Sequence, residues 1–208
     1  NQGRRCSMSR IVIVDYGLGN MRSVSRALEK AGAATLVSQN PEEISAAEGI
    51  ILPGVGAFHE GMTRLSDLAK AITDSKGHAQ ILGICLGMQM MMEESHEHGL
   101  NKGLGLIPGT VKRFSDAPGY KIPHMGWNQI KLEKLDDPLF ERIPDQSFMY
   151  FVHSFWADTP ARYCVTSTEY IDTFASSVRN GTAAGVQFHP EKSGECGIAI
   201  LKNFIRMV

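Results

Sequence analysis

The sequence predicts an α/β fold in three layers, in which helices cover both faces of a mostly parallel central sheet and the C-terminal half adds an antiparallel extension. Two observations support this prediction. Short apolar segments alternate with helix-like segments in the first half of the chain, an order typical of parallel sheets. From about Gly103 onward, glycine and proline become frequent and short segments of alternating polarity follow one another, which favours antiparallel strands.

The parallel part of the sheet is predicted from four apolar segments, which are Arg10–Val14, Ala34–Ser38, Gly49–Gly54 and Ala79–Ile84. After the first of them, apolar residues recur at helical spacing up to Gly32, which is placed to end a helix. Helical patterns also lie between the third and fourth segments and after Cys85, where the cluster MQMMM predicts the packed face of a helix. Active residues of such sheets gather in the loops beyond the carboxyl ends of the strands.

The C-terminal half is predicted as short strands followed by a helix. Strand-like segments are TVKRF, NQIKL, SFMYFVHSF and RYCVTSTEY, and Asn180-Gly181 between two further runs is a strong signal for a two-residue hairpin turn. The closing segment GIAILKNFIRMV has the pattern of an amphipathic helix. We expect residues 8–208 to form one domain, with Met8 as the native start and residues 1–7 as an expression-derived or disordered leader.

The composition argues against several classes of partner. The 208 residues carry a formal net charge of −1, which gives no reason to expect nucleic acid or an anionic membrane surface. No apolar run approaches the roughly 18 residues needed to span a bilayer, and no segment of signal-peptide length follows the start. Four cysteines without metal-ligand spacing indicate free thiols in a reducing compartment. We therefore expect a cytoplasmic protein.

Cys85 stands out because glycines flank it where an apolar strand gives way to a helical pattern. In GICLG these glycines allow a tight strand-to-helix turn, as in the G-x-S-x-G motif that displays a nucleophile. A thiol at the start of a helix also meets the positive end of the helix dipole, which favours the thiolate. The pattern alone leaves two interpretations open: a displayed nucleophile, or a structural cysteine in a tight turn.

A nucleophilic thiol needs a base and a group that orients the base, and the chain has seven histidines. In GVQFHPE a buried strand delivers His189 to its end, and Glu191 follows two residues later, so both side chains face one side of an extended chain. The carboxylate can then hold the imidazole in one tautomer. The alternative is a strand-end histidine beside an unrelated surface glutamate. Together with the cysteine turn, the pair favours a Cys–His–Glu triad.

Other histidines have plainer interpretations. His96 and His98 lie among glutamates, where a solvated helix end is favoured over a metal site. His124, in PHMGWN, has no carboxylate close in sequence, and His153 can simply pack at the end of an aromatic strand. We expect neither a metal nor a cofactor.

Two loops and one polar side chain complete the candidate site. The glycines of LPGVGAF let backbone N–H groups face inward, which suits an oxyanion hole with the N–H of Leu86 as second donor, although a plain Pro-Gly turn is the alternative. DYGLGN lacks the third glycine of a dinucleotide fingerprint, so a tight loop shaping a surface or pocket is favoured. Gln89 lies one helical turn past Cys85, so its side-chain amide can reach the pocket and bind a polar substrate.

GICLGMQ together with GVQFHPE resembles the class I (triad) glutamine amidotransferases, whose fold is flavodoxin-like. Within that family, DYGLGN, LPGVGAF, PHMGWN, YFVHSF and HPEKS are similar to the glutaminase subunits of imidazole glycerol phosphate synthase, of histidine biosynthesis. These matches run from Asp15 to Ser193, so the resemblance covers nearly all of the expected domain.

The resemblance implies Cys85 as nucleophile, His189 as base and then acid, and Glu191 as the group that orients the imidazole. It implies hydrolysis of the glutamine side-chain amide, through a cysteinyl thioester, to glutamate and ammonia. The binding residues that it implies are Gly54, Val55 and Leu86 for the oxyanion; Gln89, Glu97 and the Ser154–Phe155 backbone for glutamine; and Trp127, Tyr150 and Lys192 for a partner.

The implied partner is a cyclase subunit with a (β/α)8 barrel, which forms a heterodimer with the glutaminase and uses the ammonia to make imidazole glycerol phosphate. The family also implies low activity until the partner binds, through a misplaced oxyanion strand around Pro53–Gly56. Phe155 stands where the family often has tyrosine, a departure without consequence if only the backbone matters there.

Three alternatives remain at this point. The chain can be the glutaminase of pyridoxal phosphate synthesis or a γ-glutamyl hydrolase, although PHMGWN and HPEKS argue against both. It can also be a catalytically silent scaffold that only binds a partner, which the intact Cys85, His189 and Glu191 argue against.

Overall fold

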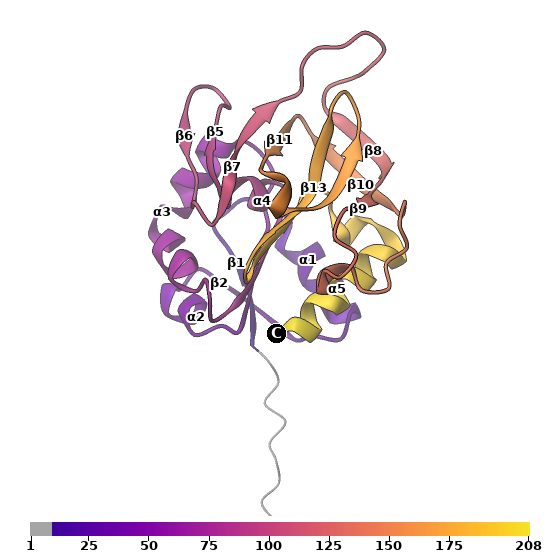
Figure 1. The fold of residues 1–208 in the computed structure, drawn as a ribbon. Helices are drawn as coiled ribbons and strands as arrows, with labels where there is room; N and C mark the ends of the chain where they lie inside the picture. Colours follow the sequence, from indigo (N-terminus) through magenta and orange to yellow (C-terminus); the bar gives the residue numbers. More distant parts are fainter. Residues whose placement is uncertain (1–9) are drawn as a thin grey trace, which may run out of the picture.

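The central sheet of the computed structural model, which describes residues 10–208, has eight strands in the order β2-β1-β3-β4-β14-β13-β12-β9 (Figure 1). The parallel strands are β1 (Ile11–Val14), β2 (Thr35–Ser38), β3 (Gly49–Leu52), β4 (Gln80–Ile84) and β14 (Ala183–Val186). The antiparallel strands are β13 (Thr173–Asn180), β12 (Cys164–Glu169) and β9 (Lys131–Leu132). The predicted parallel sheet with an antiparallel extension is confirmed. The predicted leader and the start at Met8 lie outside the described residues.

Helices cover both faces of this sheet because successive side chains of its strands point to opposite sides. Val12 of β1 belongs to a core that α2 and α3 complete, whereas Ile13 belongs to a second core with α1 and α5. None of the helices within residues 10–208 has the length and apolarity needed to cross a membrane. The helices are α1 (Met21–Lys30), α2 (Pro41–Ser45), α3 (Phe58–Asp74), α4 (Leu86–Met90) and α5 (Gly194–Met207).

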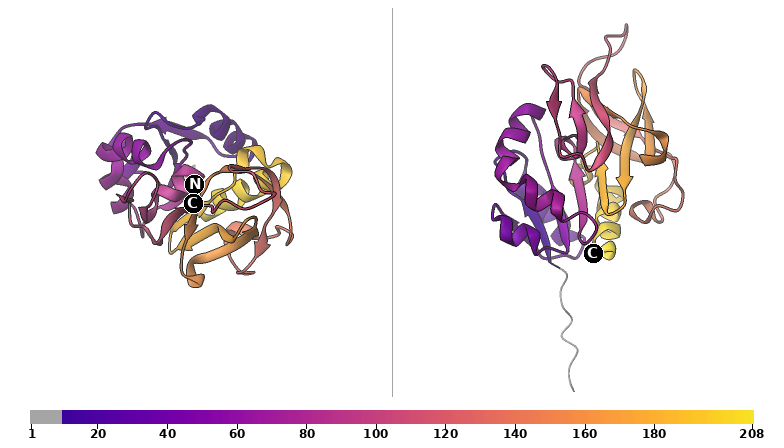
Figure 2. Two further views of the ribbon diagram at one scale, coloured as in Figure 1. Left: turned by 90° about the horizontal axis from the view of Figure 1, so that it is seen from above. Right: turned by 60° about the vertical axis from the view of Figure 1, so that its left-hand side comes forward.

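Outside the central sheet the chain forms two smaller sheets, one with the strand order β11-β7-β5-β6 and one that pairs β10 with β8. These strands gather in the half of the molecule away from the C-terminus (Figures 1 and 2). Their bounds are β5 (Met92–Ser95), β6 (Asn101–Lys102), β7 (Ile107–Arg113), β8 (His124–Gln129), β10 (Phe148–His153) and β11 (Phe155–Asp158). Short 3-10 helices are η1 (Pro138–Phe140), η2 (Ala161–Tyr163) and η3 (Pro190–Lys192).

The helix predicted after Cys85 is much shorter than the methionine cluster indicates. It ends at Met90, and Met92 already belongs to β5, so the expectation of a helix end around His96 and His98 is wrong. The N–H groups of residues 104–106 donate to the carbonyl oxygens of residues 90–92, and β5 pairs in parallel with β7. A continuous apolar run fits either structure, and pairing with a distant segment decides between them here.

The hairpin predicted at Asn180-Gly181 is present, with its turn one residue further on. Asn180 pairs with Ala183 across β13 and β14, which leaves Gly181 and Thr182 as the two-residue loop. Gly181 has φ +63°, as a turn with glycine at its first central position requires.

Candidate active site

Cys85 lies on a strained turn between β4 and α4, with φ 54° and ψ −111°. Positive φ is uncommon for residues other than glycine and costs about 1–3 kcal/mol. The flanking glycines are required because the turn is packed closely: a Cβ atom at Gly87 would lie 1.8 Å from the Leu52 carbonyl oxygen, and one at Gly83 would lie 2.7 Å from the Met88 nitrogen. Glycine is therefore required on both sides of Cys85 because neighbouring backbone, from β3 and from α4, packs too closely for a Cβ atom.

His189 and Glu191 follow β14, the strand beside β4 in the sheet. The His189 Nδ1 atom lies 2.7 Å from Glu191 Oε1, and the two side chains are only 3% and 4% exposed. The Cys85 N–H donates to the Val186 carbonyl oxygen at 2.8 Å, which joins the ends of the two strands. The cysteine turn and the histidine–glutamate pair thus come together from positions about a hundred residues apart.

The surroundings of His189 favour its protonated form. Burial lowers the pKa of the imidazole, but interactions with Cys85 and Glu191 raise it by more, to about 10. Its Nε2 atom is buried and has no hydrogen-bond partner among the described residues, so this nitrogen is available for proton exchange. The carboxylate on Nδ1 leaves Nε2 as the atom that takes or gives a proton.

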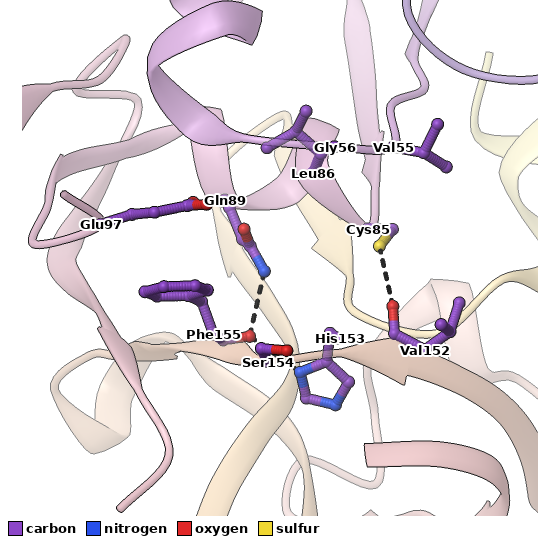
Figure 3. A pocket seen from close by; sticks show the side chains of 10 residues that line it. All are labelled: Val55, Gly56, Cys85, Leu86, Gln89, Glu97, Val152, His153, Ser154 and Phe155. Carbon is purple, nitrogen blue, oxygen red and sulfur yellow. Dashed lines mark hydrogen bonds between the residues drawn. The ribbon is translucent and has the colours of Figure 1, made fainter. Parts of the chain in front are cut away.

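A pocket of about 290 Å³ opens beside the Cys85 thiol (Figure 3). The lining includes seven of the predicted site residues, namely Val55, Cys85, Leu86, Gln89, Glu97, Ser154 and Phe155. Glu97 comes from the segment after β5, and one of its carboxylate oxygens accepts the N–H of Phe58 at 3.1 Å. The pocket combines the thiol with carboxylate, amide and backbone groups, a setting suited to a small polar substrate.

The predicted oxyanion donor Leu86 N–H is already engaged. It donates to the carbonyl oxygen of Gly54 at 3.3 Å, so this carbonyl occupies the donor that an oxyanion would need. The Tyr16 hydroxyl of the DYGLGN loop donates to the preceding carbonyl, that of Pro53, at 2.5 Å. The loop was predicted to shape a surface or pocket, and it packs against this segment. Gly54 itself does not line the pocket.

The predicted partner residues lie away from the pocket, on β8, β10 and η3. Trp127 and Tyr150 are paired across β8 and β10, with ring centroids 6.0 Å apart. Lys192 Nζ lies 6.0 Å from the centre of the Tyr150 ring. Trp127 is 56% exposed, which is unusual for so large an aromatic side chain.

Gln187 is a residue of the site that sequence reasoning missed. It is fully buried, its Nε2 lies 3.7 Å from Cys85 Sγ, and its Oε1 accepts from Gln89 Nε2 at 3.1 Å. The available signal was its place in GVQFHPE: a glutamine inside an apolar strand needs polar partners, since a buried amide without hydrogen bonds is costly.

His124 and His153 form a second buried pair. Burial lowers the pKa of His124 to about 4. It lowers the pKa of His153 to about 3, with a further contribution from His124. His153 lines the pocket, whereas His124 lies behind it on β8. Both imidazoles are therefore neutral at physiological pH.

This pair predicts a loss of stability in acid. Between about pH 6.5 and pH 4 the unfolded chain binds more protons than the folded protein, so stability falls as pH falls through that window. The loss is about 2 kcal/mol per histidine from pH 7 to pH 5. His124→Asn removes one titrating group and is expected to lose about 2 kcal/mol less than the wild type, measured by urea unfolding at both pH values. Equal losses would contradict a buried neutral His124.

The class of protein follows from its similarity to known families. Residues 12–208 match the family model "Glutamine amidotransferase class-I", and the chain belongs to that family. Curated relatives point to one branch: the "Imidazole glycerol phosphate synthase subunit HisH" of Methanosarcina mazei is 54% identical over 203 residues, covering 96% of this chain and 100% of the relative. The protein of the same name from Listeria innocua is 44% identical over 197 residues, covering 93% and 94%.

Solved structures agree on the fold. PurLQS from Thermotoga maritima superposes with a TM-score of 0.72 at 20% identity, covering 96% of this chain and 99% of that one. A structure described as a glutamine amidotransferase gives 0.71 at 17% identity, covering 93% and 98%. The predicted resemblance and fold class are thereby confirmed.

Proposed function

We propose that this chain is the glutaminase subunit of an imidazole glycerol phosphate synthase, which releases ammonia from glutamine for histidine biosynthesis. The observation that carries the proposal is the Cys85 thiol on its strained turn, at the edge of a polar pocket and beside the buried His189–Glu191 pair. The shared name of the relatives at 54% and 44% identity supports this branch over pyridoxal phosphate synthesis and γ-glutamyl hydrolysis. The cysteines within the described residues are free thiols, and we propose a location in the reducing cytoplasm for that reason.

The proposed reaction passes through a covalent intermediate. The sulfur of Cys85 attacks the side-chain amide carbon of glutamine while its proton resides on His189. The carbon–nitrogen bond then breaks, His189 gives its proton to the leaving nitrogen, and ammonia departs. Water next attacks the γ-glutamyl thioester with His189 as the base, which releases glutamate and restores the thiol. Glu191 stabilises the imidazolium and fixes its tautomer throughout.

The oxyanion hole needs a change in backbone before it can work. We propose that the peptide between Gly54 and Val55 turns over when a partner binds. This rotation takes the Gly54 carbonyl off the Leu86 N–H and brings the Val55 N–H inward, so that two donors meet the oxyanion. The proposal is supported by the hydrogen bond of the resting arrangement, in which Leu86 has no free donor to offer.

The proposed partner is a cyclase subunit with a (β/α)8 barrel, bound to the face formed by β8, β10 and η3. Met125 and Trp127 lie two residues apart on β8, so their side chains share one face, and both are more than half exposed. Lys192 lies one residue beyond Glu191, so a contact at this face is close to the triad in sequence. Direct transfer matters because free ammonia is mostly protonated near neutral pH and loses its nucleophilicity.

The test is glutamate release from glutamine by the wild-type chain, measured alone and with a cyclase subunit and its ligand. We expect a low rate alone and a rise of at least about a hundredfold in the complex, as engaging both oxyanion donors is worth several kcal/mol in the transition state. A Cys85→Ala chain in the same complex should release none. A wild-type chain that stays inactive with the cyclase would contradict the proposed function.

A further inference from the structure

A chain of hydrogen bonds runs from the outer strand β8 to the pocket through two histidines that the proposed chemistry does not use. Asn128 Nδ2 lies 3.2 Å from His124 Nε2, and His124 Nδ1 lies 2.9 Å from His153 Nε2. His153 Nδ1 then lies 2.8 Å from the carbonyl oxygen of Phe155, a residue that lines the pocket. The bonds therefore join an edge of the molecule to the pocket wall.

The groups at the two ends of this series of hydrogen bonds determine which atom donates in each of them. The Asn128 Oδ1 accepts the N–H of the following residue, and its Nδ2 donates to the Glu169 carbonyl, so Nδ2 can only donate to His124 Nε2. His124 must then carry its proton on Nδ1 and donate to His153. At the other end, the Phe155 carbonyl only accepts, so His153 must carry its proton on Nδ1. The two assignments agree.

The surroundings hold both rings in this state. His124 is stacked between Tyr170 and Phe151, with ring centroids 4.1 Å and 4.9 Å away. Burial lowers the pKa of both imidazoles, so each ring stays neutral and keeps one donor and one acceptor. A second proton on either ring would place two donors against each other.

The Phe155 carbonyl oxygen also fixes the orientation of the Gln89 side-chain amide. It accepts Gln89 Nε2 at 3.0 Å (Figure 3), and the same nitrogen donates to Gln187 Oε1 at 3.1 Å. Both amide hydrogens of Gln89 are thereby used, and its Oε1 has no partner among the described residues. An amide oxygen presented to the pocket suits a donor such as the α-ammonium group of an amino-acid substrate.

We propose that His153, which His124 holds in one tautomer, is a positioning residue of the glutamine pocket: it fixes the Phe155 carbonyl and through it orients the Gln89 amide with its oxygen toward the substrate. Residues 153–155 are where the chain passes from β10 to β11, that is, from one small sheet to the other. The histidine bond ties this crossing to β8. The inference rests on the proposed glutaminase function, and it assigns a role to His124, the histidine of the PHMGWN motif.

Two substitutions of His153 separate its two nitrogens. Asparagine places an N–H donor where Nδ1 lies, because both atoms are bonded to Cγ, and so keeps the bond to Phe155. Glutamine places its amide where Nε2 lies and loses that bond. We expect His153→Gln to raise KM for glutamine about fivefold with kcat within twofold, since a net hydrogen bond is worth about 1 kcal/mol and each tenfold about 1.4. His153→Asn should keep KM within twofold of the wild type.

The measurement is glutamate release over a range of glutamine concentrations by the complex with the cyclase, with thermal unfolding of each variant as a check on folding. His78→Gln, at an exposed histidine outside the site, is the control for the substitution itself. Ammonia-dependent synthesis by the same complexes should not change. Equal KM values for His153→Gln and His153→Asn would overturn the inference, whereas inactivity of the wild type toward glutamine would instead overturn the proposed function.

Discussion

Cys85→Ala is expected to lower glutamate release from glutamine by at least about 10⁴-fold, because loss of the nucleophile removes the covalent route altogether. Ammonia-dependent synthesis by the complex with the cyclase should persist, since ammonia supplied in solution replaces the product of the missing step. The two activities are measured side by side in the same preparation, as glutamate formed and as imidazole glycerol phosphate formed.

Cys196→Ala is the matched control for this experiment, because Cys196 is another free cysteine and lies half-buried on α5, outside the pocket. Its glutaminase rate should equal that of the wild type. If Cys85→Ala removed the ammonia-dependent activity as well, the cysteine would have a structural role in the complex. If it left glutamate release intact, Cys85 would not be the nucleophile.

Glu191→Gln is expected to lower kcat for glutamine hydrolysis by about 10²–10⁴-fold while the protein stays folded. The amide keeps the shape of the carboxylate, but it carries no charge to stabilise the imidazolium and it can hold the imidazole in the wrong tautomer. The interaction with Glu191 is one of those that raise the pKa of His189 to about 10, so the pKa of the imidazole should also fall. The pH dependence of kcat would report that change.

Glu195→Gln, four residues further on and exposed, is the control for loss of one negative charge in this part of the chain. It should leave both kcat and its pH dependence unchanged. A Glu191→Gln chain with the rate of the wild type would remove the glutamate from the proposed triad and leave a Cys–His pair. Thermal unfolding of both variants separates a catalytic loss from a loss of fold.

Local patterns in the sequence were sufficient for the backbone around the nucleophile. Two glycines beside Cys85, after an apolar segment and before a helical one, predict a tight turn because only glycine tolerates the close approach of neighbouring backbone there. The spacing of His189 and Glu191 predicts that they share a side, and their atoms lie 2.7 Å apart. Each of these features depends on residues within a few positions of one another, so the sequence expresses it directly.

Features that depend on contacts across the chain were decided only by the tertiary structure. The methionine run fits a helix or a strand, and pairing of β5 with β7 makes its end a strand. Nothing in LPGVGAF states that the Gly54 carbonyl, and not an N–H, meets Leu86. The tautomers of His124 and His153 depend on Asn128 at one end and the Phe155 carbonyl at the other. Sequence by itself determined most of the residues that the site contains, although not Gln187 or His153. Packing between distant segments decided which way each donor and acceptor faces, because the direction of a hydrogen bond depends on the partner that folding brings to it.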